Sequence, residues 1–219
     1  MELREAILNR RSYDKYTDKK VDPKLILDIL NVAIYAPSSG NMQNWNVVVV
    51  DNEDQRKKIA QASFNQLWMF QAPIHIVICD KKPDVERMYG DKSELYSVQN
   101  CAALAQNILL LATEKGLSSC WVGSFDKEAI SSVVGTRPDE TPEIIITLGY
   151  SADKPRSTRY KLERVCCFNT CGNKARDVSV FPLEKHVQKI EKESKGFLDK
   201  IKGMFKKKDK EENKVEDYY

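Results

Sequence analysis

The chain has 219 residues, of which 42% are hydrophobic and 31% are charged, and its formal net charge is +3. These values predict a soluble globular protein with one substantial domain and a tail, and the small net charge argues against a nucleic-acid-binding protein. The sequence contains no apolar run of about 20 residues and no signal-peptide pattern at its start. We therefore expect a cytoplasmic protein.

Helical and strand patterns alternate along the chain. In chain order they predict a helix at 2–10, a helix beginning at Asp22-Pro23, a loop at 36–45, a strand at 46–51, a helix at 53–62, a strand at 74–79, a polar connection at 80–92, a helix at 97–115, a strand at 119–122, a helix capped by Asp126 and a strand at 143–148. Interleaved helices and strands are typical of an α/β or α+β sandwich. The long helix is apolar on most of its circumference, which predicts a place in a core or an interface.

The loop at 36–45 is well suited to bind a polar ligand. Its sequence is Ala-Pro-Ser-Ser-Gly-Asn-Met-Gln-Asn-Trp, in which the proline ends a helix and the glycine permits a tight turn. Uncharged hydroxyl and amide groups come from Ser38, Ser39, Asn41 and Gln43. A simple connector between a helix and a strand is the alternative hypothesis for this loop.

Several kinds of catalytic site are not indicated. The sequence lacks the glycine fingerprints of Rossmann and P-loop nucleotide sites. Its two histidines, His75 and His186, give poor support to a Ser-His-Asp or Cys-His hydrolase, and we expect His75 to be a core residue. No cluster of histidine and cysteine indicates zinc. An enzyme without these groups usually borrows a cofactor.

The six cysteines fall into two groups of three. Those inside apolar segments are expected to be buried thiols: Cys79, Cys101 and Cys120. The others form a C-C-x3-C pattern, which is not a paired metal spacing: Cys166, Cys167 and Cys171. Free thiols in a reducing cytosol are favoured for this second group, and a metal or redox role is the alternative.

Four separated motifs occur in the order typical of one enzyme family. The first is Arg10-Arg11-Ser12, which Tyr16 and Val21 follow, and the second is the loop at 36–45, similar to A-P-S-x-x-N-x-Q-P-W with asparagine in place of the proline. The third is G-L-S-S-C-W-V-G-S-F at 116–125, and the fourth is L-G-Y at 148–150, followed by Lys154-Pro155 and Arg159-x-x-Leu162-Glu163. Over about residues 1–165 the chain therefore resembles the nitroreductase family of flavin oxidoreductases.

The resemblance implies an α+β fold, with a central, mostly antiparallel sheet flanked by helices. It further implies an interlocked homodimer, in which the long helix serves core and interface and FMN binds between the subunits. It assigns cofactor binding to Arg10, Arg11, Ser12, Pro37, Ser38, Ser39, Asn41, Gln43, Asn65, Gly123, Ser124, Lys154, Arg159 and Lys161. It assigns no metal and no catalytic side chain, because the flavin N5 atom carries the chemistry.

The resemblance also gives these residues roles. The Arg-Arg-Ser segment contacts the phosphate, ribityl chain and pyrimidine edge, while the loop at 36–45 comes from the other subunit. Asn65 points an amide toward the flavin, Gly123 and Ser124 run along the isoalloxazine, and the last three cations are phosphate ligands. These roles fit the chemistry, since a phosphate dianion favours arginine and lysine and a fixed cation such as Arg10 stabilises reduced flavin. A solvated helix end is the alternative for Arg10 and Arg11.

Three positions depart from the family pattern. Asp14 replaces a basic residue, with Lys15 beside it as a substitute of different geometry. Asn44 stands in place of the proline of the second motif, and Ser151 in place of the proline that commonly follows Gly-Tyr. The change to Asp14 affects the charge expected at the pyrimidine edge of the flavin.

The function implied is ping-pong hydride transfer from NADH or NADPH, through FMN, to a nitroaromatic, quinone or similar acceptor. Trp68, Phe70 and Tyr89 are candidates to line an aromatic slot, although core positions are the commoner use of such residues. Same-fold enzymes that dehalogenate, oxidise heterocycles or break down flavin are one alternative. A non-catalytic flavoprotein tethered to a membrane is another.

The tail has a composition of its own. We expect a flavin domain at 1–182 and a charged amphipathic segment at 183–219. Residues 185–208 hold nine lysines against three acids, with apolar residues on one helical stripe. Packing on the same domain or on the dimer partner, peripheral contact with an anionic membrane surface, and disorder are the alternatives for this segment.

Overall fold

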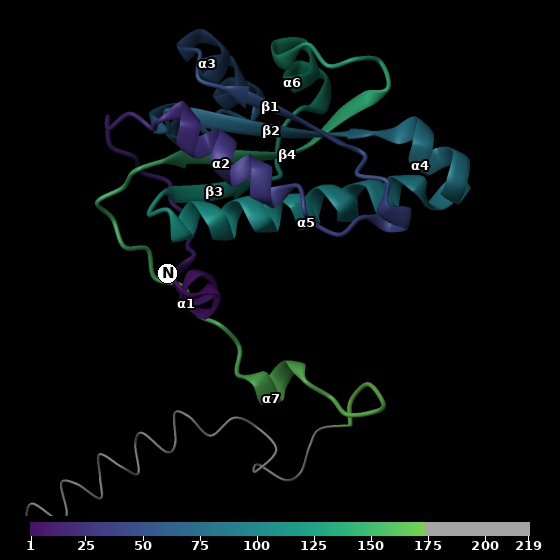
Figure 1. Ribbon diagram of the computed structural model, residues 1–219. Helices are drawn as coiled ribbons and strands as arrows, with labels where there is room; N and C mark the ends of the chain where they lie inside the picture. Colours follow the sequence, from purple (N-terminus) through teal and green to yellow (C-terminus); the bar gives the residue numbers. More distant parts are fainter. Residues whose placement is uncertain (174–219) are drawn as a thin grey trace, which may run out of the picture. The chain divides into compact units, whose positions relative to one another are not determined.

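The computed structural model describes residues 1–173 of the chain (Figure 1). One compact unit comprises Met1–Ser157, and a second unit begins at Thr158. The expected domain boundary at 182/183 and the expected amphipathic helix at 185–208 lie outside the described residues. The flavin-domain motifs, in contrast, all lie within them.

The helices and strands follow one another in an α+β order. They are α1 (Leu3–Asn9), α2 (Pro23–Ala33), η1 (Ser39–Asn41), β1 (Trp45–Val50), α3 (Glu53–Ala62), η2 (Leu67–Gln71), β2 (Ile74–Lys81), α4 (Lys82–Tyr89), η3 (Gly90–Lys92), α5 (Ser93–Glu114), β3 (Ser118–Val122), α6 (Lys127–Val134), β4 (Glu140–Gly149) and α7 (Leu162–Val165). Asp22 and Asp126 cap α2 and α6 through their carboxylates, as the sequence predicts.

The four strands form one sheet in the order β1-β2-β4-β3, and every neighbouring pair is antiparallel. Val48 lies opposite Val77, which in turn lies opposite Ile145, so the apolar centres of three strands are in register. The antiparallel sheet flanked by helices confirms the expected α+β fold. β1 and β3 are the edge strands, and β3 borders the segment that follows α1.

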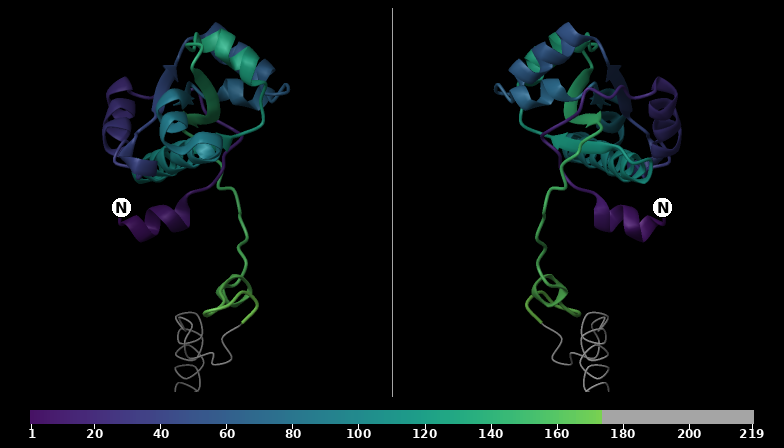
Figure 2. Two further views of the ribbon diagram at one scale, coloured as in Figure 1. Left: turned by 90° about the vertical axis from the view of Figure 1, so that its right-hand side faces the viewer. Right: turned by 90° about the vertical axis from the view of Figure 1, so that its left-hand side faces the viewer.

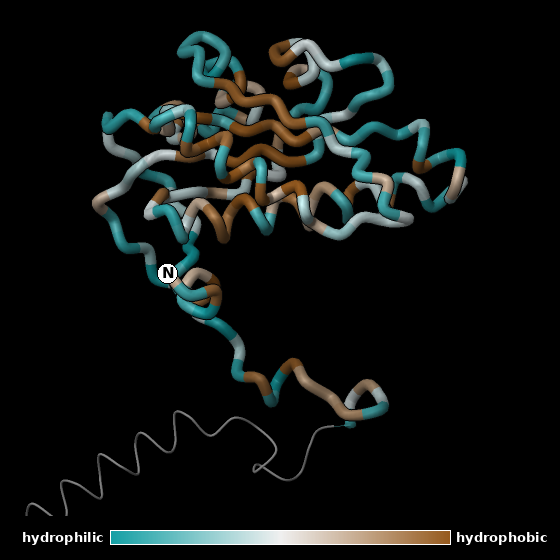
Figure 3. Tube along the Cα trace, viewed as in Figure 1, coloured by the Kyte–Doolittle hydropathy of each residue, from teal (hydrophilic) through white to brown (hydrophobic). Residues whose placement is uncertain are grey.

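Helices cover both faces of the sheet (Figures 1 and 2). Ile76, Ile78 and Ile146 point into a core shared with α2 and α5, whereas Val77 and Ile145 point into a second core shared with α3 and α6. This alternation follows from the two-residue period of a strand. Figure 3 shows the apolar residues concentrated in these strands. Within residues 1–173, no helix is long and apolar enough to cross a membrane.

The expected polar connection at 80–92 is wrong. Strand β2 continues to Lys81, and α4 and η3 occupy the remaining residues. Only Val85 of α4 is buried, so the helix has no apolar stripe that the sequence pattern reveals. Helix α5 begins at Ser93, four residues before the expected start at 97. The sequence pattern does not reveal this first turn because its residues are mostly polar.

Candidate functional site

The Arg-Arg-Ser segment lies against the outer edge of the sheet. Ser12 makes an isolated parallel bridge with Ser119 of β3, and the N–H of Tyr13 donates to the carbonyl of Ser119 at 3.1 Å. Arg10 and Arg11 are half-buried and Ser12 is exposed. The structure therefore brings the first and third sequence motifs together, although more than one hundred residues separate them.

Arg11 turns back onto the end of α1. Its guanidinium donates to the carbonyls of Leu8 and Arg10 at 2.6 and 2.8 Å. This cation satisfies carbonyl groups that the end of a helix otherwise leaves unpaired. It thus fits the alternative of a helix-end cation, and in this conformation Arg10 is the better placed of the two for a ligand.

The Tyr16 side chain fastens the same segment to the sheet. Its hydroxyl donates to the carbonyl of Tyr13 at 3.0 Å and lies 2.7 Å from the hydroxyl oxygen of Thr147. Burial raises the pKa of the Tyr16 phenol, so the group is a neutral hydrogen-bonding anchor. Gly149 makes room for the ring, because a Cβ at this position would lie 2.8 Å from a ring carbon of Tyr16 and 2.7 Å from Pro73.

The Cys120 thiol lies at the junction between the two motifs. Burial raises its pKa, and this effect is opposed by a hydrogen bond with Ser12 and by the positive charge of Arg10. Cys120 is half-buried, unlike Cys79 and Cys101, so the expectation of a buried thiol is confirmed for two of the three. The Ser119 hydroxyl beside it is 1% exposed and has no hydrogen-bond partner among the described residues.

The Gly123-Ser124 segment continues from β3 and meets the loop after α3. The Gln66 side-chain amide donates to the carbonyl of Ser124 at 3.1 Å, which places Asn65 close to this segment. Phe64 and Asn65 both have positive φ, at 54° and 59°. Such strained backbone persists only where its surroundings hold it, and it clusters at functional sites.

The loop at 36–45 has the same kind of strain. Its Gly40, Asn41 and Gln43 have φ of 56°, 57° and 49°. Asn41 and Gln43 are exposed, as is Pro37, so these groups are available to a ligand or a partner chain. The N–H of Gln43 donates to the Ser38 hydroxyl at 3.0 Å, which closes the loop on itself.

The structure does not bring this loop to the Arg-Arg-Ser segment of the same chain. The loop is bonded to α5 at Asn100, whereas β3 begins just after the C-terminal end of α5 at Glu114. Fourteen residues of helix span about 21 Å at about 1.5 Å per residue. The two halves of the expected cofactor site are thus at opposite ends of α5 (Figure 1).

The remaining candidate cations follow β4. Lys154 is exposed, while Arg159 and Lys161 belong to the second unit and are also exposed. Arg159 donates to the carbonyl of Thr158 at 2.8 Å. Lys15, the expected substitute for the missing basic residue, forms an exposed ion pair with Asp153 at 3.5 Å.

The remaining residues singled out in the sequence are the aromatic-slot candidates, His75 and the C-C-x3-C cysteines. Trp68 and Phe70 pack against the core of α3 and α6, and Tyr89 makes an edge-to-face contact with Tyr96. His75 is completely buried, as expected of a core residue. Of the C-C-x3-C cysteines, the first two are half-buried and Cys171 is exposed. Among residues 1–173, no group of histidine, cysteine and acidic side chains is arranged to hold a metal ion.

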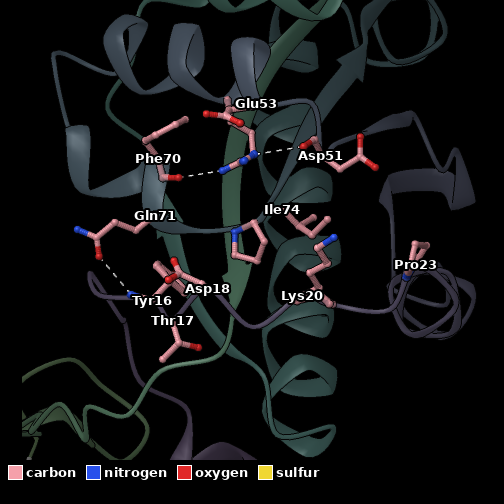
Figure 4. Close-up of a pocket in the computed structure, with 13 residues that line it drawn as sticks. Tyr16, Thr17, Asp18, Lys20, Pro23, Asp51, Glu53, Phe70, Gln71 and Ile74 are labelled. Carbon is pink, nitrogen blue, oxygen red and sulfur yellow. Dashed lines mark hydrogen bonds between the residues drawn. The ribbon is translucent and has the colours of Figure 1, made fainter.

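A cavity of about 850 Å³ lies elsewhere in the same unit, between the segment after Tyr16 and the junction of η2 with β2 (Figure 4). Lys20 and Arg56 are the cations that line it, and the Arg56 guanidinium already donates to the carbonyls of Phe70 and Ala72 at 2.8 Å. No candidate cofactor residue lines this cavity.

Comparison with known proteins gives the family. A protein-family model described as "Nitroreductase family" matches residues 7–68 and 64–150 of the chain. The chain belongs to the nitroreductase family. A Methanothermobacter thermautotrophicus protein named as an NADH dehydrogenase/NAD(P)H nitroreductase is 34% identical over 161 residues, which cover 71% of this chain and 80% of that protein. The expected enzyme class, an NAD(P)H-dependent oxidoreductase of the nitroreductase family, is confirmed.

Two further matches agree with this assignment. A Bacillus subtilis protein named FMN reductase [NAD(P)H] is 27% identical over 141 residues, covering 63% of this chain and 53% of that protein. The crystal structure of a nitroreductase family protein from Clostridium difficile superposes with a TM-score of 0.70 and 27% identity, over 78% of this chain and all of that one. The nitroreductase fold is thus supported by sequence and by structure.

Sequence patterns do not reveal the contacts of four residues of the site: Tyr16, Thr147, Gly149 and Cys120. Tyr16 was noted only as part of a motif, and its partners Thr147 and Gly149 were not connected with it. Their contact depends on pairing across 131 residues, which no local pattern reveals. Cys120 was noted as part of the third motif, but its contact with Ser12 was not foreseen.

Proposed function

We propose that this chain is an FMN-dependent oxidoreductase that transfers electrons from NADH or NADPH to a nitroaromatic, quinone or similar acceptor. The observation that carries the proposal is the docking of Ser12 and Tyr13 on Ser119 of β3. This contact joins the Arg-Arg-Ser segment to the strand that leads into Gly123-Ser124, and the Gln66 amide joins that segment to the turn of Phe64 and Asn65. The match to a relative named FMN reductase supports flavin as the ligand.

The residues present fit the chemistry of FMN. Arg10 and Lys154 carry the positive charge that a phosphate dianion requires, and the Ser119 hydroxyl, which has no partner among residues 1–173, is a buried polar group next to the Arg-Arg-Ser segment. When bound, FMN accepts a hydride from the nicotinamide at N5 and delivers two electrons to an acceptor. Donor and acceptor would occupy the same site in turn, which requires no Rossmann site in the chain.

The protein contributes position and charge. Arg10 would supply a fixed cation close to the flavin, and such a cation favours the negatively charged reduced form. The backbone at Gly123 has no side chain to keep a flat ring away, so the ring can approach the N–H groups of this segment. Ser12, held by the bridge to Ser119, would offer its hydroxyl to the cofactor.

A homodimer completes the site. About 21 Å of α5 separates Asn100, where the loop at 36–45 is attached, from the end of the helix that leads to β3. A second copy can supply the missing loop to each site. The chain also exposes large apolar side chains on α1, on α2 and directly after α2, which a dimer interface would cover: Leu3, Ile7, Leu8, Leu27, Val32, Ile34 and Tyr35.

Steady-state kinetics test the reaction. NADH and NADPH are each varied against a quinone and a nitroaromatic, and parallel double-reciprocal lines are expected because donor and acceptor occupy the same site in turn. A flavin-free preparation is the control, and added FMN should restore turnover. A protein that retains FMN but oxidises neither donor would contradict this function and favour another flavin reaction.

Membrane contact remains a separate proposal for the tail. Its basis is the basic, amphipathic sequence at 185–208, which lies outside the described residues. Flotation with anionic liposomes of the full chain and of a chain ending at residue 182 tests it. Equal flotation of the two proteins would exclude the tail as a membrane tether.

A further inference from the structure

A buried amide pair fastens the loop at 36–45 to helix α5. The Asn100 side-chain oxygen accepts from both the N–H and the hydroxyl of Ser39, at 2.9 and 3.1 Å. The Asn100 amide nitrogen donates to the Asn44 side-chain oxygen at 2.7 Å, and Asn44 in turn donates to the Ser97 hydroxyl at 3.0 Å. Asn44 and Asn100 are each 3% exposed, so the bonds that link them to each other and to Ser97 are shielded from water, whereas those from Ser39 are partly buried.

The fastened residues enclose the strained part of the loop. Ser39 and Asn44 are the points of attachment, and Gly40, Asn41 and Gln43 between them have positive φ. Asparagine tolerates this conformation better than glutamine does, so Gln43 in particular needs its surroundings to hold it. A Cβ at Gly40 would lie 3.0 Å from the Tyr89 hydroxyl, so α4 closes over the turn as well.

We infer that Asn44 and Asn100 form a clamp that presets this loop for binding FMN. The inference rests on the proposed function. Both asparagines are positioning residues, because they are buried beneath the loop while its exposed amides face outward. The clamp orders the loop when the chain folds, so that less conformational freedom is lost when the ligand binds. It also gives a physical role to Asn44, which stands where the family motif has proline.

The test replaces the clamp and follows the loop and the ligand separately. Asn100→Leu removes every bond of the central amide while keeping its approximate size. The matched control is Gln55→Ala, since the Gln55 amide donates to the carbonyl of Val133 at 3.1 Å between helices on the opposite face of the sheet. Asn44→Ala is the second variant, for use if Asn100→Leu does not fold.

Two quantities are measured for each variant: hydrogen exchange of the Ser39 amide, and the dissociation constant for FMN. In Asn100→Leu we expect exchange at Ser39 to be on the order of tenfold faster and FMN binding to be weaker by a similar factor. Turnover at saturating FMN should be unchanged, because the clamp does not touch the reacting atoms. Gln55→Ala should change neither quantity, even if it lowers global stability.

Each outcome decides the inference. Unchanged exchange at Ser39 overturns the clamp, and faster exchange with unchanged FMN affinity overturns its role in binding. If the wild-type protein binds no FMN, the proposed function and the cofactor role fail together, while the exchange rates still decide whether the two asparagines hold the loop. If Gln55→Ala loses as much affinity for FMN as Asn100→Leu does, the loss reflects general destabilisation, and the inference is also overturned.

Discussion

Lowering the pH should destabilise this protein through His75. The ring is completely buried, and its Nε2 atom lies 2.9 Å from the carbonyl of Met69. Burial, with the nearby charge of Arg56, lowers the pKa of His75 from 6.5 to about 4, although the bond to Met69 opposes the shift. The folded chain therefore binds fewer protons than the unfolded chain between these two pH values, and the free energy of unfolding falls as the pH falls below 6.5.

The size of this effect follows from the two pKa values. The contribution of His75 is fully present above pH 6.5, is about 2 kcal/mol smaller at pH 5, and is about 3 kcal/mol smaller below pH 4. Urea unfolding of the wild type and of His75→Gln at pH 8 and pH 5 measures it. The difference in unfolding free energy between the two pH values should be about 2 kcal/mol smaller in the variant. Equal pH dependence, or an NMR titration of His75 with a midpoint near 6.5, would refute the reasoning.

Three further predictions concern the residues around the candidate site. Tyr16→Phe should cost about 1–3 kcal/mol of stability in urea unfolding, because it removes the hydroxyl that bonds the Tyr13 carbonyl and the Thr147 hydroxyl, and an unchanged midpoint would contradict this. Gly149→Ala should cost about 1–3 kcal/mol through overpacking against the Tyr16 ring, and a thermal midpoint equal to that of the wild type would count against the contact. Asn41→Ala should weaken FMN binding measured by fluorescence titration while leaving the unfolding midpoint unchanged; undiminished binding would make the loop a connector.

Sequence patterns predicted most of the sheet and its helices. The strand at 74–79 and the helices at 53–62 and 97–115 were recognised because their apolar residues repeat with the period of their structure. Helix α4 was not recognised, since it buries only Val85 and its residues are otherwise polar. Tertiary contact with α5, rather than an apolar stripe, accounts for a helix in this segment.

The sequence motifs predict the residues of the candidate site, but they do not predict the contacts that hold these residues in position. The Arg-Arg-Ser segment and the loop at 36–45 stand out in the sequence because their residue types suit phosphate and flavin. Asn44 looked like the least typical residue of the loop, yet it is buried and bonded to Asn100. That partner lies 56 residues away, so only the packing of α5 beneath the loop reveals the role of either asparagine.

The central claim is that this chain holds FMN and reduces it with a nicotinamide. The most direct measurement is the visible absorption spectrum of the purified protein, before and after anaerobic addition of NADH or NADPH. We expect the flavin bands of a bound FMN, near one per chain, and their loss on addition of at least one of the two donors. A protein that remains colourless after incubation with FMN would contradict the claim, as would bound flavin that neither donor reduces.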